Sequence, residues 1–222
     1  MPRRETPIVT NEIYHIYNRS IALQPIFKTN SDYYRFSNLV DYYRFINQPV
    51  RFSHLNRLPK DEKESLIKRM HKDKELNLEI YAFAFMPTHY HFLAKQLNDK
   101  GISDFIRLLQ NSYAKYFNLK SNRNGSLFQH MFRIKRIQSE EQLLHIARYI
   151  HLNPLTNYVL KDEKELSDFQ WTSFTDYITS KRRPFVNTTF IGNHYKSMET
   201  FGKFTLDQLN YQRELEQIKH LL

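Results

Sequence analysis

The stretch NLEIYAFAFMPTHYHFLAK, residues 77–95, contains two apolar runs separated by a Pro-Thr pair. Aromatic and aliphatic residues that favour strands fill both runs, and a Pro-Thr pair between them is typical of a turn. We therefore predict one strand over residues 77–85 and a second over residues 89–95, paired as an antiparallel hairpin. This hairpin is the strongest indication of fold in the sequence.

The second run begins with His89 and His91, which flank Tyr90. Alternate side chains of a strand share a face, so the two imidazoles would lie about 6–7 Å apart on one face with Tyr90 on the other. Neutral imidazole binds divalent cations well, which makes the pair a candidate half of a metal site. Two ligands hold a metal weakly, and such a pair is often only hydrogen-bonded or exposed, so a third ligand is needed.

The remaining chain interleaves strand and helix patterns, which favours an α+β fold with an antiparallel sheet. Proline, capping residues and apolar periodicity set the expected boundaries. We predict a strand at 12–17, a helix at 31–46 capped by Ser31, a charged insertion at 47–76 with a short helix near 60–71, a helix at 102–118 capped by Ser103, an extended basic segment at 127–137, a helix at 139–152 capped by Ser139 and stopped by Asn153-Pro154, and a closing helix at about 205–222.

The composition restricts the class of protein. The chain has 222 residues, enough for one medium domain with an appendage, and its 33 Lys and Arg against 23 Asp and Glu give a net charge of +10. That charge favours a polyanionic partner, nucleic acid first and an anionic membrane surface second. Cysteine is absent, which excludes disulfides and thiolate metal sites. With no apolar run of about 18 residues and no apolar signal core, we expect a cytoplasmic protein without a membrane span.

A second motif, RYIHLNP at residues 148–154, places Tyr149 and Asn153 four residues apart. On a helix these two side chains share a face. A tyrosine hydroxyl is a candidate nucleophile, and an asparagine carbonyl is a candidate ligand for a hard cation. Alone, Tyr149 would be read as a packed tyrosine and Asn153 as a helix stop before proline. Together with His89 and His91, they could surround one cation that leaves positions open for phosphate oxygens, as in phosphoryl transfer.

At these motifs the sequence resembles the single-tyrosine HUH endonucleases, which include insertion-sequence transposases and REP-associated tyrosine transposases. The pattern of two histidines followed by a helical tyrosine and Asn-Pro is specific, and the matching segments run in family order over about residues 12–177. They are YHIYNRS (14–20), AFMPTHYHFLAK (84–95), GSLFQHMFRIKRI (125–137), RYIHLNPL (148–155) and WTSF (171–174).

The resemblance implies a ferredoxin-like antiparallel sheet with helices on one side. His89 and His91 would ligate Mg²⁺ or Mn²⁺, Asn153 would be the third ligand, and Tyr149 would attack a phosphate of single-stranded DNA. The products would be a 5′-phosphotyrosine link and a free 3′-hydroxyl. Tyr90 departs from the family, which usually has an apolar residue there.

Residues 1–178 would form this transposase domain, and residues 179–222 a C-terminal extension with a terminal helix. The insertion at 47–76 and the chain after about 178 lie outside the shared pattern. We therefore transfer no family property to either segment.

Basic residues near these motifs are candidate phosphate contacts, although any of them could be an ordinary solvated cation. The expected set is Arg19, Lys115, Lys120, Arg123, Arg133, Lys135 and Arg136. Arg148 lies about 100° around the helix from Tyr149 and receives no catalytic role. Tyr113 and Tyr116, on an amphipathic helix, are interpreted as core or stacking residues rather than nucleophiles.

The expected partner is single-stranded DNA that contains a hairpin, bound by a monomer or a homodimer associated with the nucleoid. Two alternatives remain open from the sequence. One is a transposase-derived protein that binds DNA hairpins without cutting them. The other is a sheet-based RNA-binding protein that uses the same basic and aromatic surface.

Overall fold

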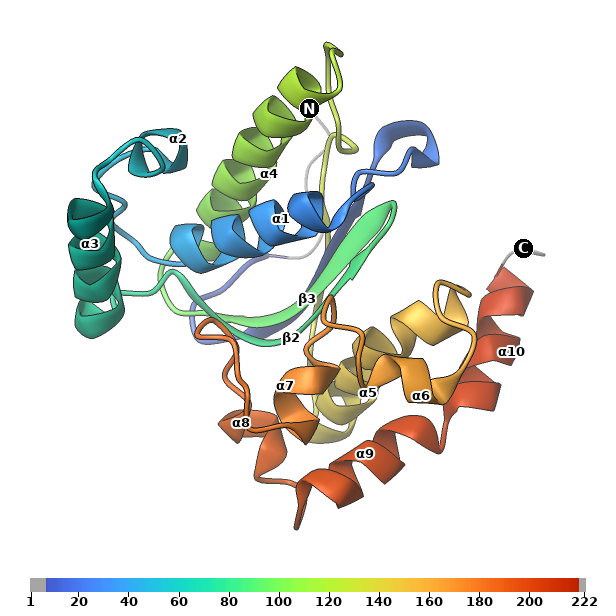
Figure 1. The fold of residues 1–222 in the computed structure, drawn as a ribbon. Coiled ribbons are helices and arrows are strands. Elements are labelled where there is room, and N and C mark those ends of the chain that lie inside the picture. Colours follow the sequence, from blue (N-terminus) through green and yellow to red (C-terminus); the bar gives the residue numbers. More distant parts are fainter. Residues whose placement is uncertain (1–6, 220–222) are drawn as a thin grey trace.

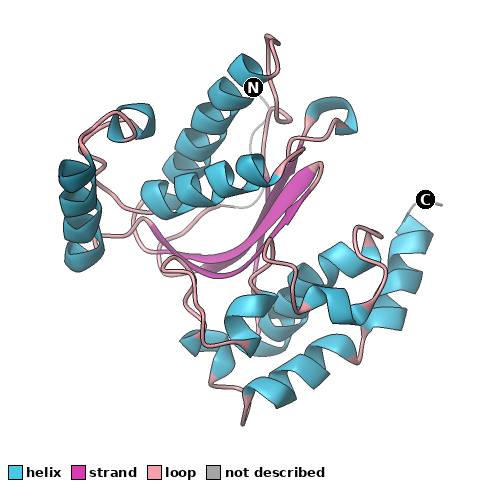
Figure 2. Ribbon diagram, in the orientation of Figure 1, coloured by secondary structure: helices cyan, strands magenta, loops and turns pink. Residues whose placement is uncertain are grey.

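An antiparallel sheet with strand order β2-β3-β1-β4 lies at the centre of the molecule (Figures 1 and 2). The computed structural model describes residues 7–219, with side chains through residue 214. The predicted hairpin is present, and the predicted first strand pairs with its second strand. The four strands of the described chain are β1 (Ile13–Arg19), β2 (Leu78–Met86), β3 (His89–Gln96) and β4 (Arg133–Arg136).

Helices cover both faces of the sheet (Figure 2). They are α1 (Asn30–Tyr43), α2 (Phe52–Leu55), α3 (Lys60–Asp73), α4 (Gly101–Lys120), α5 (Glu140–Thr156), α6 (Glu163–Leu166), α7 (Phe174–Ile178), α8 (Thr189–Gly192), α9 (Met198–Leu206) and α10 (Leu209–Lys219), with a 3-10 turn η1 (Ile21–Leu23).

Tyr90 of β3 identifies the face that α1 and α4 cover. Its ring packs 5.3 Å from that of Phe36 in α1, and its hydroxyl accepts a hydrogen bond of 2.7 Å from Gln110 in α4. The neighbouring His91 points to the opposite face, where α5 lies. The α+β fold with an antiparallel sheet is therefore confirmed, but the expectation of helices on one side is wrong. Nearly every residue of β2 is buried, which requires cover on both faces.

The predicted N-caps of α1 and α4 are wrong by two or three residues. Thr29, not Ser31, caps α1, because the Asp32 carboxylate accepts a hydrogen bond of 2.9 Å from the Thr29 amide in a capping box. Helix α4 begins at Gly101 rather than after Ser103. A Cβ on Gly101 would overlap the carbonyl oxygen of Asn77, so close packing against that backbone requires glycine here.

Helix α5 begins as predicted and ends later than predicted. The Ser139 hydroxyl accepts a hydrogen bond of 3.1 Å from the Gln142 amide at the N-terminus. Asn153-Pro154 does not stop the helix, which continues to Thr156. Proline lacks an amide hydrogen and therefore removes one helical hydrogen bond, a loss that the final turn tolerates. Asn153 consequently lies inside the helix, one turn beyond Tyr149.

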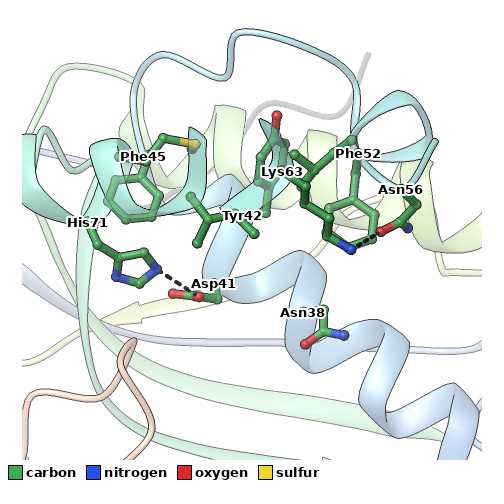
Figure 3. Close-up of a pocket in the computed structure, with 11 residues that line it drawn as sticks. Asn38, Asp41, Tyr42, Phe45, Phe52, Asn56, Lys63 and His71 are labelled. Carbon is green, nitrogen blue, oxygen red and sulfur yellow. Dashed lines mark hydrogen bonds and ion pairs between the residues drawn. The ribbon is translucent and has the colours of Figure 1, made fainter. Parts of the chain in front are cut away.

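The insertion at 47–76 folds into α2 and α3 and packs beside the end of α1 (Figure 1). A cavity of about 160 Å³ lies between these helices (Figure 3). Four of its polar side chains are paired with one another: His71 Nε2 lies 3.1 Å from Asp41 Oδ2, and Lys63 donates to Asn56 at 2.9 Å. We interpret this cavity as a packing gap between the insertion and the domain.

The C-terminal extension packs against the domain. Its chain hydrogen-bonds to the free edge of β2, where the Asn187 amide donates to the Ile80 carbonyl at 2.8 Å. Helices α9 and α10 pack on α5, and the buried Arg148 guanidinium lies 3.5 Å from the centre of the Phe204 ring. Arg148 thus anchors the extension, in agreement with its exclusion from catalysis.

The closing helix predicted at 205–222 corresponds to the last two residues of α9 and to α10. Residues 220–222 of the predicted range lie outside the described part. None of the helices in residues 7–219 has the length and apolar character of a membrane span.

Candidate active site

Three rows of side chains cross the sheet on the face that α5 covers. Directly paired residues of adjacent strands share a face, so the register defines each row. The middle row runs from His91 in β3 through Tyr17 in β1 to Arg133 in β4. The flanking rows pair His89 with Arg19, and Leu93 with His15 and Lys135. Three imidazoles and three cations therefore share this face.

Helix α5 places Tyr149 and Asn153 over the same face. The Tyr149 ring lies 5.7 Å from the His91 ring, centre to centre, at an interplanar angle of 87°. Asn153 is fully buried, and its Oδ1 lies 3.3 Å from His89 Nε2. The four residues predicted to converge are thus brought together by a strand and by a helix some 60 residues later in the chain. Their chemical roles remain predictions.

The donor set around His89 fits a hard or borderline divalent cation. Thr88 Oγ1 lies 3.0 Å from His89 Nδ1, and when this nitrogen carries the proton, Nε2 presents a lone pair toward Asn153 Oδ1. Two acceptors that face each other at 3.3 Å repel unless a cation or proton lies between them. Adjacent ligands of an octahedral ion with bonds of about 2.1 Å are about 3.0 Å apart, close to this spacing.

The orientation of the Asn153 carboxamide also favours its oxygen as a ligand. Oδ1 accepts a hydrogen bond of 3.1 Å from Asn157, whereas the buried Nδ2 has no hydrogen-bond partner among the described residues. No three His, Asp, Glu or Cys side chains in the described chain are grouped closely enough to hold an ion. A metal here would therefore depend on the amide oxygen as well as on the histidine pair.

His15 and Tyr17 belong to this site, and the sequence interpretation assigned neither a role in it. His15 Nε2 lies 2.9 Å from His91 Nδ1, and both histidines are buried. The His15 ring also lies 6.0 Å from the Tyr149 ring, and the Tyr17 ring stacks 5.4 Å from that of His91. The signal was present, because His-x-Tyr at 15–17 has the same two-residue period as His-x-His at 89–91.

The predicted DNA-contacting residues divide between the two faces of the sheet. Arg19, Arg133 and Lys135 are exposed on the histidine face. Arg136 pairs with Tyr14, so it points to the other face, where it forms an ion pair with Glu12. Only the first three lie beside the candidate site.

The remaining predicted cations are on or near α4, on the face away from the histidines. Lys115 is exposed there. Lys120 donates to the buried Asp32 carboxylate at 2.6 Å, and this hydrogen bond raises the pKa of Lys120. Arg123 donates to Asn118 at 2.7 Å within the turn after the helix. These contacts give Lys120 and Arg123 structural roles, so we do not include them in the DNA-binding proposal.

The rival tyrosines lie away from the histidines. Tyr113 is buried under the opposite face, its hydroxyl donates to the Ile26 carbonyl at 2.5 Å, and burial raises its pKa. Tyr116 donates to Asp32 at 3.0 Å. Both match the interpretation as packing residues.

His151, two residues after Tyr149, is fully buried on another side of α5. Its Nε2 lies 2.9 Å from the hydroxyl of Ser173. Burial lowers the pKa of His151 to about 3, so this imidazole is neutral at physiological pH.

Comparison with known proteins identifies the family. The model of the IS200-like transposase family matches residues 41–153, just over half of the chain, and this range contains both histidines of β3, Tyr149 and Asn153. No curated protein matches the chain. The fold is similar to a solved structure of a REP-associated tyrosine transposase bound to a REP hairpin, with a TM-score of 0.53, 14% identity, and coverage of 85% of this chain and 94% of that one. The chain belongs to the IS200-like transposase family.

Proposed function

We propose that this protein is a metal-dependent single-stranded DNA endonuclease and strand transferase with Tyr149 as its nucleophile. The observation that supports it is the meeting of a phenol, two imidazoles and a buried carboxamide on one face of the sheet. Membership of a transposase family supports the same reaction class.

His89, His91 and Asn153 would hold Mg²⁺ or Mn²⁺. The ion would neutralise charge on the phosphate oxygens as it develops in the transition state. All three ligands are uncharged, so the phosphate of the DNA itself supplies the negative charge nearest to the ion. We therefore expect the ion and the DNA to bind more tightly together than separately.

Tyr149 would attack the phosphorus of the scissile phosphodiester. Its oxygen loses a proton and bonds to phosphorus, the bond from phosphorus to the 3′ oxygen breaks, and that oxygen leaves with the electron pair and gains a proton. The new 5′-phosphotyrosine bond retains the energy of the broken bond. A free 3′-hydroxyl can therefore reverse the step and join strands without a nucleotide cofactor.

His15 would position His91. A buried hydrogen bond of 2.9 Å between the two rings fixes the orientation of the His91 imidazole, and hence the direction of its remaining nitrogen. His15 is therefore a positioning residue rather than a metal ligand in this proposal.

The substrate would be single-stranded DNA adjoining a hairpin. Arg19, Arg133 and Lys135 would contact phosphates on either side of the scissile bond, because they border the histidines on the same face. The similar structure bound to a REP hairpin supports a hairpin as part of the substrate. All four site residues lie in one chain, which supports cleavage by a monomer, and a homodimer is the alternative. With such a substrate, the protein would act on chromosomal DNA in the cytoplasm.

The test is covalent capture of DNA. Wild-type protein, a labelled oligonucleotide that carries a hairpin, and Mn²⁺ or Mg²⁺ should give a protein–DNA band that survives denaturation. Tyr149→Phe should bind the DNA and give no such band, whereas Tyr34→Phe, at an exposed tyrosine of α1, should behave as wild type.

Three results would refute the proposal in different ways. An adduct with Tyr149→Phe would exclude Tyr149 as the nucleophile. Hairpin binding by wild-type protein without any adduct, in either metal, would favour the non-cleaving hairpin binder. Metal-independent binding of RNA at least as tight as that of DNA would favour the RNA-binding alternative.

A further inference from the structure

A strained apolar turn projects beside the candidate active site. In η1 the backbone reverses over residues 21–24, and the Gln24 amide donates to the Ile21 carbonyl at 3.3 Å. The two central residues, Ala22 and Leu23, have φ of 54° and 53°. Consecutive residues at positive φ define a turn that normally selects Asn, Asp or Gly, so an Ala-Leu pair here is unfavourable for the backbone.

The side chains of this turn point to solvent although they are apolar. Leu23 is 59% exposed and Ile21 is 40% exposed. A turn that needed only to connect β1 to α1 would be more stable with polar residues that accept positive φ. Strained residues of this kind cluster at active sites and ligand-binding sites, so the turn is a candidate contact site.

The turn is held rigidly at the end of the sheet that carries His89. The Ser20 amide donates to the Thr88 carbonyl at 2.8 Å, directly before His89, and the Ile21 amide donates to the Leu127 carbonyl at 3.0 Å. On its other side the Ile26 amide donates to the Pro87 carbonyl at 2.7 Å. The apolar tip is therefore fixed relative to the histidine pair, and Arg19, two residues before Ile21, is paired with His89.

We propose that Leu23, with Ile21, forms a wedge that packs against the base at the junction between the paired stem and the single strand. This inference rests on the proposed function, because it assumes a hairpin-bearing DNA substrate. A DNA strand whose phosphate lies over His89 and Tyr149 continues past Arg19 toward this tip. Apolar side chains presented rigidly to DNA pack on base faces or separate base steps, and such contacts do not depend on base sequence. The wedge would mark where the stem ends and so select the phosphate that reaches Tyr149.

The experiment compares Leu23→Asn with Leu119→Asn, both in the Tyr149→Phe background so that no DNA is cleaved. Asparagine tolerates positive φ and removes the apolar surface. Leu119 is the matched control, because it is 87% exposed at the end of α4, on the other face of the sheet. Two oligonucleotides are used, one with a stem and a single-stranded arm and one fully single-stranded. A 2-aminopurine at the first unpaired position reports base stacking by fluorescence.

Leu23→Asn should lose about tenfold in affinity for the junction DNA, within the range of roughly 5- to 150-fold expected for one stacked base. It should also lose the 2-aminopurine signal, bind the fully single-stranded DNA as before, and unfold at the same or a higher urea concentration than its parent. Leu119→Asn should match the parent in every assay.

Three results would overturn the wedge. The first is that the two asparagine variants bind the junction DNA with equal affinity. The second is that Leu23→Asn loses the same affinity for both oligonucleotides. The third is that Leu23→Asn unfolds at a lower urea concentration than its parent, which would make Leu23 a packing residue. The chemistry is judged separately, because failure of the wild-type protein to form an adduct refutes the proposed reaction and leaves this binding result unaffected.

Discussion

His151 gives a quantitative prediction about how pH affects the stability of the helix that carries Tyr149 and Asn153. Its imidazole is completely buried and hydrogen-bonded to Ser173, whose hydroxyl in turn accepts a hydrogen bond of 2.8 Å from the Phe83 amide in β2. Burial disfavours the charged form and lowers the pKa of His151 from 6.5 to about 3. The residue is thus a neutral link between α5 and the sheet.

The sign of the effect follows from proton binding. Between pH 6.5 and about 3 the unfolded chain protonates this histidine and the folded chain does not. Stability from neutral His151 is therefore complete above pH 6.5 and falls as the pH decreases through this window. Each pH unit inside the window removes up to about 1.4 kcal/mol, so lowering the pH from 7 to 5 should remove about 2 kcal/mol through this residue. For a chain of this size that corresponds to a fall of about 4–8 °C in the unfolding temperature.

The assay is urea unfolding of wild-type protein, His151→Gln and His145→Gln at pH 7 and pH 5. Glutamine can still hydrogen-bond to Ser173 but has no titrating group, so His151→Gln should lose about 2 kcal/mol less than wild type between the two pH values. His145 lies on the same helix, is 57% exposed, and provides the control, which should follow wild type. The comparison uses the change with pH, so any constant cost of the substitution cancels.

The reasoning would be refuted if wild type and His151→Gln lost the same unfolding free energy on acidification. That result would mean that His151 becomes protonated in the folded protein, either because water reaches it or because α5 detaches at mildly acidic pH. A fall in adduct formation at pH 5 without a loss of folded protein would instead point to the site residues on the sheet.

Four further predictions concern the site and its surface. His15→Phe should weaken Mn²⁺ binding by about 10- to 100-fold, because His91 loses its orienting partner. Electron paramagnetic resonance of the free ion measures this affinity, and an unchanged value would remove His15 from the site. In calorimetric titrations Mn²⁺ should bind more tightly than Mg²⁺, because imidazole suits the transition metal better. A hairpin oligonucleotide should raise the affinity for either ion. Tighter binding of Mg²⁺ than of Mn²⁺ without DNA would argue against the proposed ligands. Arg133→Ala and Lys135→Ala should each reduce the slope of log affinity against log salt by about 0.7–1, and an unchanged slope would place the DNA elsewhere. Lys120→Ala should leave that slope unchanged and instead lower the urea midpoint, because Asp32 loses its ion-pair partner; a changed slope would restore Lys120 to the DNA-binding surface.

Local patterns were sufficient to predict the hairpin and the pair on α5. His89 and His91 share a face because alternation in a strand is a local property, and Tyr149 and Asn153 share a face because helical spacing is local as well. The convergence of the two pairs was inferred from their chemistry and from resemblance to a family. No pattern within either segment could establish it.

The features that were not predicted depend on pairing between distant segments. His15 joins the site only because β1 lies beside β3 in a register that opposes Tyr17 to His91. A shift of one residue would send His15 to the other face, and the sequence of neither strand specifies this register by itself. Lys120 was expected to contact DNA, but it pairs with Asp32, which is 88 residues away in the chain.

Asn153, a candidate metal ligand, shows how a rule that is correct in most helices can misplace the end of a particular helix. An asparagine before proline is normally read as a helix stop, because proline disfavours helical geometry in the residue before it. Here the helix continues for three residues after Asn153, and the Asn157 amide donates to the Asn153 backbone carbonyl at 3.0 Å, while the Asn157 side chain donates to Asn153 Oδ1. The same downstream residue therefore supports the backbone and directs the carboxamide oxygen toward His89. A carboxamide on a frayed helix end would be hydrated and mobile, whereas one inside a closed final turn is buried in a single orientation, which is what a metal ligand requires.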